Sequence, residues 1–506
     1  MSWLIAATLM APLSAAAAGL GLKDHPRWRD MVTVFGLATA AVSAFAMLFE
    51  VTSNGSHALQ VGGWGPELGI VLVADRFAVL VLPVALSIIL VVELFAIGQR
   101  RTAWGANPEL AGPLLGVLTS GVSLAILTGD LFTLFVAFEL ILVSSYVLLT
   151  HQGQREQIRA GMTYVVMNLF ASTLFLFGLA FVYSATGTVN LALLAERIPE
   201  LSTGARLGIG GWFFVVFGTK AAMFPLFSWL PDSYPTAPTT ITAVFAGLLT
   251  KIGIYAMIRF HTLTGMDDLG PVILMIAGVT MIVGALGALA QSDVKRILSF
   301  HVISQIGYML MGLGLFSAAG TTGAILFLIH HMPVKTVLFL VGGLIENHQG
   351  TSALDRSGGL AAKRPIIAVL FAIPALSLAG LPPFSGFVAK FGVISAGIDA
   401  QSTAIVIVAL VGGALTLLSM TKIWIGVFWG TPPAISPNNP TERAEEAPPV
   451  GVRPERANQR LMVGATSLAV AGTLVISVFA GPLFDLSEKA AEDLRDSSSY
   501  ISLAKQ

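Results

Sequence analysis

Long apolar runs alternate with short polar segments along the whole chain. A membrane-spanning helix needs about 20 consecutive apolar residues, and fourteen such runs can be marked in the sequence. They do not show the short alternating segments of a transmembrane β-barrel. The predicted spans lie near residues 2–22, 31–52, 77–97, 111–129, 131–150, 161–184, 207–229, 240–258, 272–290, 297–316, 321–343, 365–398, 402–430 and 461–483. The pattern therefore predicts an all-α polytopic membrane protein with about 14 transmembrane helices.

The composition agrees with a membrane protein and excludes several other classes. Of the 506 residues, 55% are apolar and 11% are charged, whereas soluble domains have about 25% charged residues. The formal net charge is zero, so the chain lacks the basic excess of a nucleic-acid-binding protein. It contains no cysteine, which excludes disulfides and Cys-ligated iron–sulfur clusters in this chain. No metal-ligand cluster or phosphate-binding glycine loop occurs in a suitable context, and we expect no cofactor and no metal.

The distribution of Lys and Arg predicts the orientation in the membrane. The first run is expected to be a span rather than a cleaved signal, because no Lys or Arg precedes it. With both termini outside the cytoplasm, the cytoplasmic segments hold sixteen Lys and Arg and the external segments seven, as the positive-inside rule requires. Five basic residues remain inside predicted spans, and all are lysines: Lys220, Lys251, Lys335, Lys390 and Lys422.

Two opposite charges lie alone in the middle of predicted spans. Glu139 lies in LFVAFELILVSSYVLL and Lys220 in WFFVVFGTKAAMFPLFSWL. An ionisable side chain at the centre of a span costs about 2.5–3.5 kcal/mol on insertion scales, so it usually pairs or lines a hydrated path. The sequence predicts an ion pair between Glu139 and Lys220. The alternative is a static salt bridge that only joins two helices.

Further ionisable residues follow in two later spans. Lys251 lies near the centre of its span in LLTKIGIY, and His330, His331 and Lys335 lie in LFLIHHMPVKTVLFL. His331 and Lys335 are four residues apart and share a helix face. Because histidine titrates near neutrality, this grouping favours a proton relay. The alternative is hydrogen bonding between helices.

A polar stripe follows one face of the predicted span at 297–316. His301, Ser304, Gln305 and Tyr308 lie at positions i, i+3, i+4 and i+7 of SFHVISQIGYML. These side chains either line a water-filled channel or join neighbouring helices by hydrogen bonds, and the sequence favours neither.

Two predicted spans contain helix-breaking residues close to a lysine. Pro225 follows Lys220 by five residues, and Pro382 and Pro383 precede Lys390 in LAGLPPFSGFVAK. Proline removes a backbone hydrogen bond and kinks or breaks a helix. Broken helices beside a buried charge, in corresponding halves of a transporter, indicate an ion site between inverted repeats. A plain proline kink is the alternative.

The motifs together resemble one family, that of the antiporter-like subunits shared by respiratory complex I and the Mrp-type multisubunit cation/proton antiporters. The resemblance covers roughly residues 70–430. It rests on FELILVSSYVL (138–148), GTKAAMFPLFSWLPDSYPTAP (218–238), SDVKRILSFHVISQIGYM (292–309), HHMPVKTVLFL (330–340) and LAGLPPFSGFVAKF (378–391). The stretch 218–255 is more similar to the Mrp branch.

The resemblance implies a fold of fourteen helices with two inverted five-helix repeats, in which helices 7 and 12 are discontinuous. It also implies that the buried Glu, Lys and His residues carry protons along a hydrated axis at mid-membrane. Expected parts are three N-terminal helices (1–100), a first repeat (108–260), a second repeat (270–430), a cytoplasmic linker (431–460), and a last helix with its tail (461–506). The matching site residues are Glu139, Lys220, Lys251, Lys335 and Lys390, and His330 and His331 join them as candidate proton carriers because they lie close to Lys335 in the sequence.

The expected function is that of a proton-translocating subunit of a cation/proton antiporter in a bacterial inner membrane. Na⁺, or K⁺ or Li⁺, would leave in exchange for entering protons, and other membrane subunits would be partners. The alternative is a proton-pumping subunit of a complex I-like or hydrogenase-linked redox enzyme, which would use the same residues. A structural scaffold without transport is disfavoured, because its buried lysines would serve no purpose.

Overall fold

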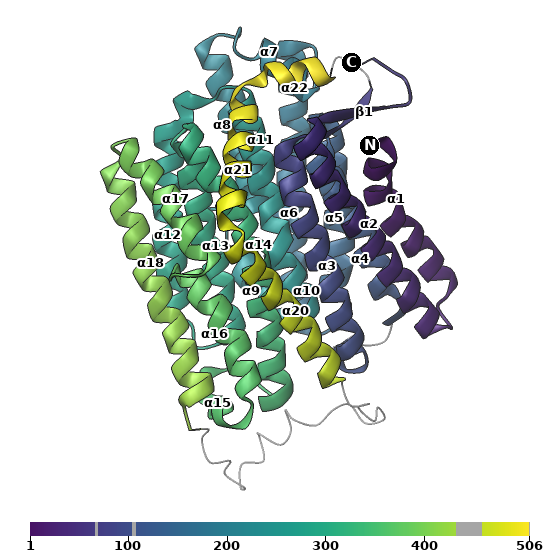
Figure 1. Ribbon diagram of the computed structural model, residues 1–506, viewed down its shortest axis with the longest axis vertical. Helices are drawn as coiled ribbons and strands as arrows, with labels where there is room; N and C mark the ends of the chain where they lie inside the picture. Colours follow the sequence, from purple (N-terminus) through teal and green to yellow (C-terminus); the bar gives the residue numbers. More distant parts are fainter. Residues whose placement is uncertain (66–68, 104–107, 432–457, 505–506) are drawn as a thin grey trace.

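The computed structural model describes residues 1–65, 69–103, 108–431 and 458–504, and most of them are helical. Long helices lie side by side and form one bundle (Figure 1). The helices of the first half are α1 (Ser2–Gly21), α2 (Pro26–Asn54), α3 (Arg76–Ala103), α4 (Ala111–Leu127), α5 (Leu131–Thr150), α6 (Arg155–Thr186), α7 (Leu191–Arg197), α8 (Thr203–Ala221), α9 (Trp229–Thr236), α10 (Thr239–Val244) and α11 (Thr250–Leu263).

The second half continues the bundle. Its helices are α12 (Gly270–Ala290), α13 (Val294–Gly314), α14 (Ala318–Gln349), α15 (Leu360–Lys363), α16 (Pro365–Ala379), α17 (Ser385–Asp399), α18 (Thr403–Ile423), α20 (Gln459–Val478), α21 (Ala480–Arg495) and α22 (Ser497–Ala504). Two segments are π-helical: η2 (Phe245–Leu249) lies between α10 and α11, and η5 (Trp424–Trp429) extends the C-terminal end of α18. Short 3₁₀ turns are η1 (Pro108–Leu110), η3 (Asp267–Leu269) and η4 (Leu354–Arg356).

The expectation of a mostly helical, polytopic membrane protein is confirmed. Each of the fourteen apolar runs in the sequence coincides with one helix, or with consecutive helical segments. Eleven of the described helical segments are long and apolar enough to cross a membrane, and α4 and α16 are shorter apolar helices. The number of fourteen crossings stays a prediction. Most of the predicted linker, residues 432–457, lies outside the described residues.

Helix α14 lies at the centre of the second half. Residues 320–345 are all buried, because α14 packs against helices that include α3, α10, α13, α16, α17, α20 and α21. The helix continues through Pro333, so this proline does not break it. His330, His331 and Lys335 therefore lie on one continuous, enclosed helix.

Two long helices of the bundle are interrupted, and a lysine lies beside each interruption. Helix α8 ends at Ala221, one residue after Lys220, and α9 begins at Trp229. Helix α16 ends at Ala379, and α17, which carries Lys390, begins at Ser385. Pro225 lies in the first interval, and Pro382 and Pro383 lie in the second. Both intervals leave backbone groups at helix ends, which neighbouring side chains can bind.

A β-hairpin that the sequence pattern did not predict precedes α3. Strands β1 (His57–Val61) and β2 (Ile70–Ala74) pair antiparallel, with His57 opposite Ala74. Asp75 follows β2 and forms two hydrogen bonds, of 2.7 and 2.8 Å, with the guanidinium of Arg259 on α11. Both side chains are buried. This ion pair joins the N-terminal helices to the first predicted repeat.

The acidic tail after residue 484 is helical up to Ala504, apart from Asp496. Helices α20, α21 and α22 run across the bundle (yellow in Figure 1), and α21 packs against α14 and α3. Asp493 of α21 binds Arg76 through two hydrogen bonds of 2.8 and 2.7 Å. Figure 1 places both chain termini at the same end of the bundle, opposite to α15.

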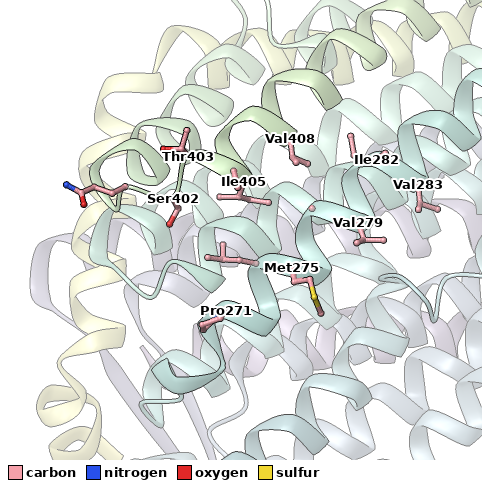
Figure 2. Close-up of a pocket in the computed structure, with 13 residues that line it drawn as sticks. Pro271, Met275, Val279, Ile282, Val283, Ser402, Thr403, Ile405 and Val408 are labelled. Atoms are coloured by element: carbon pink, nitrogen blue, oxygen red, sulfur yellow. The ribbon is translucent and has the colours of Figure 1, made fainter.

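An apolar groove runs along the outside of the bundle between α12 and α18 (Figure 2). Pro271, Met275 and Val279 line it from α12, and Ile405 and Val408 line it from α18. None of the buried ionisable residues borders this groove. Its apolar lining is typical of a surface that faces lipid rather than of a site for a charged substrate.

Candidate ion-translocation site

Glu139 and Lys220 are connected through a serine hydroxyl. Ser172 of α6 donates a hydrogen bond to the Glu139 carboxylate, and Lys220 Nζ donates one of 2.9 Å to Ser172 Oγ. Lys220 Nζ also donates to the backbone oxygen of Asn168 at 3.3 Å and lies 5.3 Å from the centre of the Phe138 ring. Described atoms of Glu139 and Lys220 make no direct salt bridge. The direct ion pair expected from the sequence is therefore replaced by a serine-bridged pair.

Helix α6 contributes residues that the sequence analysis missed. Tyr164, Asn168 and Ser172 are spaced by four residues, are buried and share one face of the helix. Tyr164 exchanges a hydrogen bond of 2.6 Å with Ser145 of α5. The spacing of these three polar residues in an apolar helix was the available signal. Small polar residues also join helices in many membrane proteins, so this signal has low specificity.

A small cavity beside Lys220 leads toward the next lysine. Tyr164, Asn168 and Trp229 line it together with Leu249 of the π-helical segment η2. Leu249 is the last residue of η2, two positions before Lys251. The cavity therefore extends from Lys220 to the last residue of η2, the segment that precedes α11.

Lys251 lies at the junction of η2 and α11 and is almost completely buried. Its Nζ donates hydrogen bonds to the backbone oxygen of Ala246 and to Thr250 Oγ1, the second at 3.1 Å. A π-helical turn widens the hydrogen-bonding ring and leaves backbone carbonyls such as that of Ala246 available. Both acceptors belong to its own chain segment. In the described part of the chain, Lys251 has no carboxylate partner.

Lys335 and His331 face Lys251 from α14. Lys335 Nζ donates a hydrogen bond of 3.1 Å to the backbone oxygen of Leu298 on α13. The charges of Lys251, Lys335 and a protonated His331 are close enough to repel one another. Neither ring nitrogen of His331 has a hydrogen-bond partner among the described residues, although the side chain is fully buried. Buried polar atoms are normally satisfied, so these two unpaired nitrogens favour water next to His331.

The predicted polar stripe of α13 is divided between two neighbouring helices. His301 Nε2 contacts Ser419 Oγ at 2.5 Å, and Gln305 Nε2 donates to Thr416 Oγ1 at 3.4 Å, so both residues face α18. Tyr308 also faces α18, because its hydroxyl donates to the backbone oxygen of Ala409.

Ser304 differs from the other three residues of the stripe. It donates a hydrogen bond of 3.0 Å to the backbone oxygen of Met281 on α12, and it therefore joins two helices. His301 Nδ1 and Gln305 Oε1 lack partners among the described residues. These two unpaired atoms favour water beside His301 and Gln305, and not beside Ser304.

Lys390 occupies the interruption between α16 and α17. Its Nζ donates a hydrogen bond of 3.0 Å to the backbone oxygen of Ala379, the last residue of α16. A cation is stabilised at a helix C-terminus by the unsatisfied carbonyl groups there. The same Nζ lies 5.0 Å from the centre of the Tyr308 ring, which links Lys390 to α13.

The two adjacent histidines of α14 point to different neighbours. His330 Nδ1 contacts Ser385 Oγ at 2.8 Å, at the start of α17, and His330 lies close enough to Lys390 to interact with its charge. His331 instead interacts with Lys251 and Lys335. The pair therefore connects the centre of the bundle with the interruption at α17.

Lys422 differs from the other four lysines inside predicted spans, because it caps a neighbouring helix. It donates hydrogen bonds of 2.8 and 2.6 Å to the backbone oxygens of Leu289 and Gln291, at the C-terminal end of α12. This contact satisfies free carbonyl groups and has a structural explanation.

The site consists of side chains that can each bind and release a proton. A row of ionisable side chains runs from Glu139 through Lys220, Lys251, His331 and Lys335 to Lys390, and both ring nitrogens of His331 lack a partner among the described residues. Within the ranges that the structure describes, no group of three or more His, Asp or Glu is placed to hold a metal ion.

Comparisons with known proteins identify the family to which the chain is similar. The family model described as "NADH:quinone oxidoreductase/Mrp antiporter, TM" matches residues 128–416. The D subunit of the Na(+)/H(+) antiporter of Alkalihalophilus pseudofirmus is 40% identical over 99% of both chains. The D subunit of the Na(+)/H(+) antiporter of Bacillus subtilis is 38% identical over 79% of this chain and 82% of its own.

Two solved structures are similar over the whole length. A chain of the Mrp complex from Dietzia sp. DQ12-45-1b superposes with a TM-score of 0.89 at 34% identity and covers 100% of both chains. A chain of the membrane-bound sulfane sulfur reductase, an archaeal respiratory membrane complex, gives a TM-score of 0.87 at 25% identity over 99% of both chains.

Proposed function

The chain belongs to the NADH:quinone oxidoreductase/Mrp antiporter family, and we propose that it is the D-type, proton-translocating subunit of a multisubunit Na⁺/H⁺ antiporter. The full-length identity of 40% to the D subunit of such an antiporter supports this assignment. The similarity to a chain of an Mrp complex supports other membrane subunits as partners. The chain acts as a transporter subunit rather than as an enzyme.

One observation carries the mechanism: in the part of the chain that the structure describes, Lys251, Lys335 and Lys390 bind uncharged oxygens and form no ion pair with a carboxylate. Each added proton on Lys251, His331 or Lys335 repels protons on its neighbours. A proton that enters at one end therefore favours release at the other. At the first end, the Ser172 hydroxyl lets the Glu139–Lys220 pair close or open as Lys220 gains or loses its charge.

The second half of the pathway depends on the interruption at α17. Lys390 holds a proton at the C-terminus of α16, and His330 contacts Ser385 at the start of α17. Pro225, Pro382 and Pro383 keep the two interruptions from closing into regular helix. Residues 108–260 and 270–430 form the two inverted repeats, each with one interrupted helix and its lysine.

The orientation follows from the charges. The basic loops lie on the cytoplasmic side of a bacterial plasma membrane, and the two termini, which share one end of the bundle, lie outside (Figure 1). Protons move inward along the row, and Na⁺ moves outward through the complex.

A redox-driven proton pump is the second candidate, because the similar chain of the sulfane sulfur reductase complex belongs to a respiratory enzyme. The purified complex in proteoliposomes distinguishes the two. Addition of Na⁺ without an electron donor should move protons across the membrane. Proton movement that requires an electron donor and does not depend on Na⁺ would overturn the antiporter assignment.

A further inference from the structure

A partly buried ion pair lies at the predicted cytoplasmic end of α13 and α14. Lys295 Nζ lies 2.7 Å from Glu346 Oε2, and Thr239 of α10 donates a hydrogen bond of 3.1 Å to the same oxygen. The side chain of Lys295 is 8% exposed and that of Glu346 is 28% exposed. Glu346 is thus in contact with water on one side and with the protein interior on the other.

Glu346 shares a helix face with Lys335. The two residues are eleven positions apart on α14, and at 100° per residue this spacing brings their side chains to the same side, about 16 Å apart along the axis. Gly342 lies on that face as well, seven positions after Lys335 and four before Glu346. A line along one face of α14 therefore passes from the protein surface at Glu346 to the centre of the row.

Gly342 leaves open space inside the protein. The residue is buried, yet a Cβ atom built on it would meet no described atom within 4 Å. Gly343, the next residue, shows the contrast, because a Cβ there would lie 2.4 Å from Thr239 Cγ2. The open space is therefore a local feature of the face that carries Lys335 and Glu346.

Polar groups around this line favour water in the open space. Thr240, which follows Thr239 in α10, has a buried hydroxyl without a partner among the described residues. Lys335 binds the backbone oxygen of Leu298, which lies three residues after Lys295 on α13. Phe339 is fully buried and lies between Lys335 and Gly342 on the shared face.

We propose that Glu346, Lys295 and Gly342 form a water-filled entrance through which protons pass between the cytoplasm and Lys335. The ammonium of Lys335 releases a proton to water at Gly342, Glu346 accepts this proton and passes it to cytoplasmic water, and the ammonium of Lys295 remains as the counter-ion of Glu346. This inference rests on the proposed function, because that function identifies the proton as the ion that moves. The water-filled space itself can be tested without transport.

The natural absence of cysteine in this chain permits a direct test of the space. The variant Gly342→Cys would be assembled with its partner subunits in everted vesicles, which expose the cytoplasmic face. The probe is 2-aminoethyl methanethiosulfonate, and mass spectrometry of this chain reads the modification. We expect modification of Gly342→Cys and none of the control Val341→Cys, which places a buried thiol on another face of α14. An unmodified Gly342→Cys chain in the assembled complex would contradict the proposal of a water-filled entrance.

A second experiment tests the role of the carboxylate. Glu346→Gln should lower Na⁺/H⁺ exchange about tenfold or more, because a positioned proton-transfer group typically contributes at least this much. Glu346→Asp, which keeps the carboxylate, should restore most of the rate. A merely structural role predicts the opposite order, because glutamine keeps the side-chain length and can still bind Thr239 and Lys295.

The matched control is the neighbouring surface ion pair. Arg296 lies 3.3 Å from Asp232, and these side chains are 41% and 62% exposed. Asp232→Asn should leave exchange unchanged. Equal losses in Glu346→Gln and Asp232→Asn would contradict a specific entrance. If the unmodified complex shows no exchange while Gly342→Cys is still labelled, the proposed function fails and the entrance stands.

Discussion

The ammonium of Lys220 and the carboxylate of Glu139 are joined by one hydroxyl group, that of Ser172. Such a link differs from a direct salt bridge, because rotation of one hydroxyl can break it without moving either helix. The free energy that separates the linked and separated states is then small. A small difference of this kind is what a charge-driven switch requires.

Ser172→Ala removes the link but keeps both charges. We expect exchange to fall about tenfold, since a hydrogen bond to a charged group contributes about 1.5–3 kcal/mol. Ser172→Thr keeps a hydroxyl at this position and should retain most of the rate. Collapse of a respiration-generated ΔpH on addition of Na⁺ measures both variants. An alanine variant that matches wild type would show that the hydroxyl has no part in the switch.

Lys390→Ala removes the proton-carrying group at the interruption between α16 and α17. Exchange should be strongly impaired over a broad pH range. In the variant, no side chain would hold a proton beside the carbonyl of Ala379 and the Tyr308 ring. Lys422→Ala is the control, since Lys422 caps α12 and stands outside the row. The same vesicle assay at several pH values applies. Unaltered activity of Lys390→Ala across that range would remove Lys390 from the pathway.

Gly253 sets the distance between α11 and the end of α8. A Cβ atom at Gly253 would lie 2.8 Å from the backbone nitrogen of Ala221 and 3.1 Å from the carbonyl carbon of Lys220. Gly253→Ala should therefore separate the two helices at a cost of about 1–3 kcal/mol and reduce the thermal stability of the solubilised complex. Gly211→Ala should be neutral, because open space surrounds that position. Equal thermal stability of the two variants would contradict the close packing.

The two carboxylates that hold the end of the bundle should differ in their contribution to stability. Asp75 and Arg259 are both buried, and removal of one partner of a buried pair costs about 3–5 kcal/mol. Asp493 and Arg76 are 27% and 32% exposed, and pairs of this kind contribute about 0–1 kcal/mol. Asp75→Ala should therefore lower the thermal unfolding temperature much more than Asp493→Ala. The reverse order would be incompatible with the observed burial.

The helical spans could be predicted because the bilayer imposes a length and an apolar composition on each of them. The β-hairpin before α3 and the helices α21 and α22 have no such constraint. The hairpin strands are five residues long. The acidic tail is too polar to resemble a span, and its helices are stabilised by packing, α21 on α3 and α14 and α22 on α7.

The candidate site was predictable where it contains charges and not where it contains neutral groups. Glu139, Lys220, Lys251 and Lys335 stand out because a charge inside the membrane is costly. Ser172 costs little to bury, and only the structure shows that it stands between two charges. The stripe of α13 gave a similar difficulty, since helical spacing alone did not separate Ser304, which binds α12, from the residues that face α18.

The most direct test of the pathway uses everted vesicles from cells that lack their own Na⁺/H⁺ antiporters. This chain and its partner subunits would be produced with either wild-type Glu139 or Glu139→Ala, at matched levels of assembled complex. After respiration has built a ΔpH, Na⁺ is added. We expect the gradient to collapse with the wild-type chain and to persist with Glu139→Ala. A collapse of equal rate and extent in both would contradict proton transfer through the Glu139–Ser172–Lys220 group.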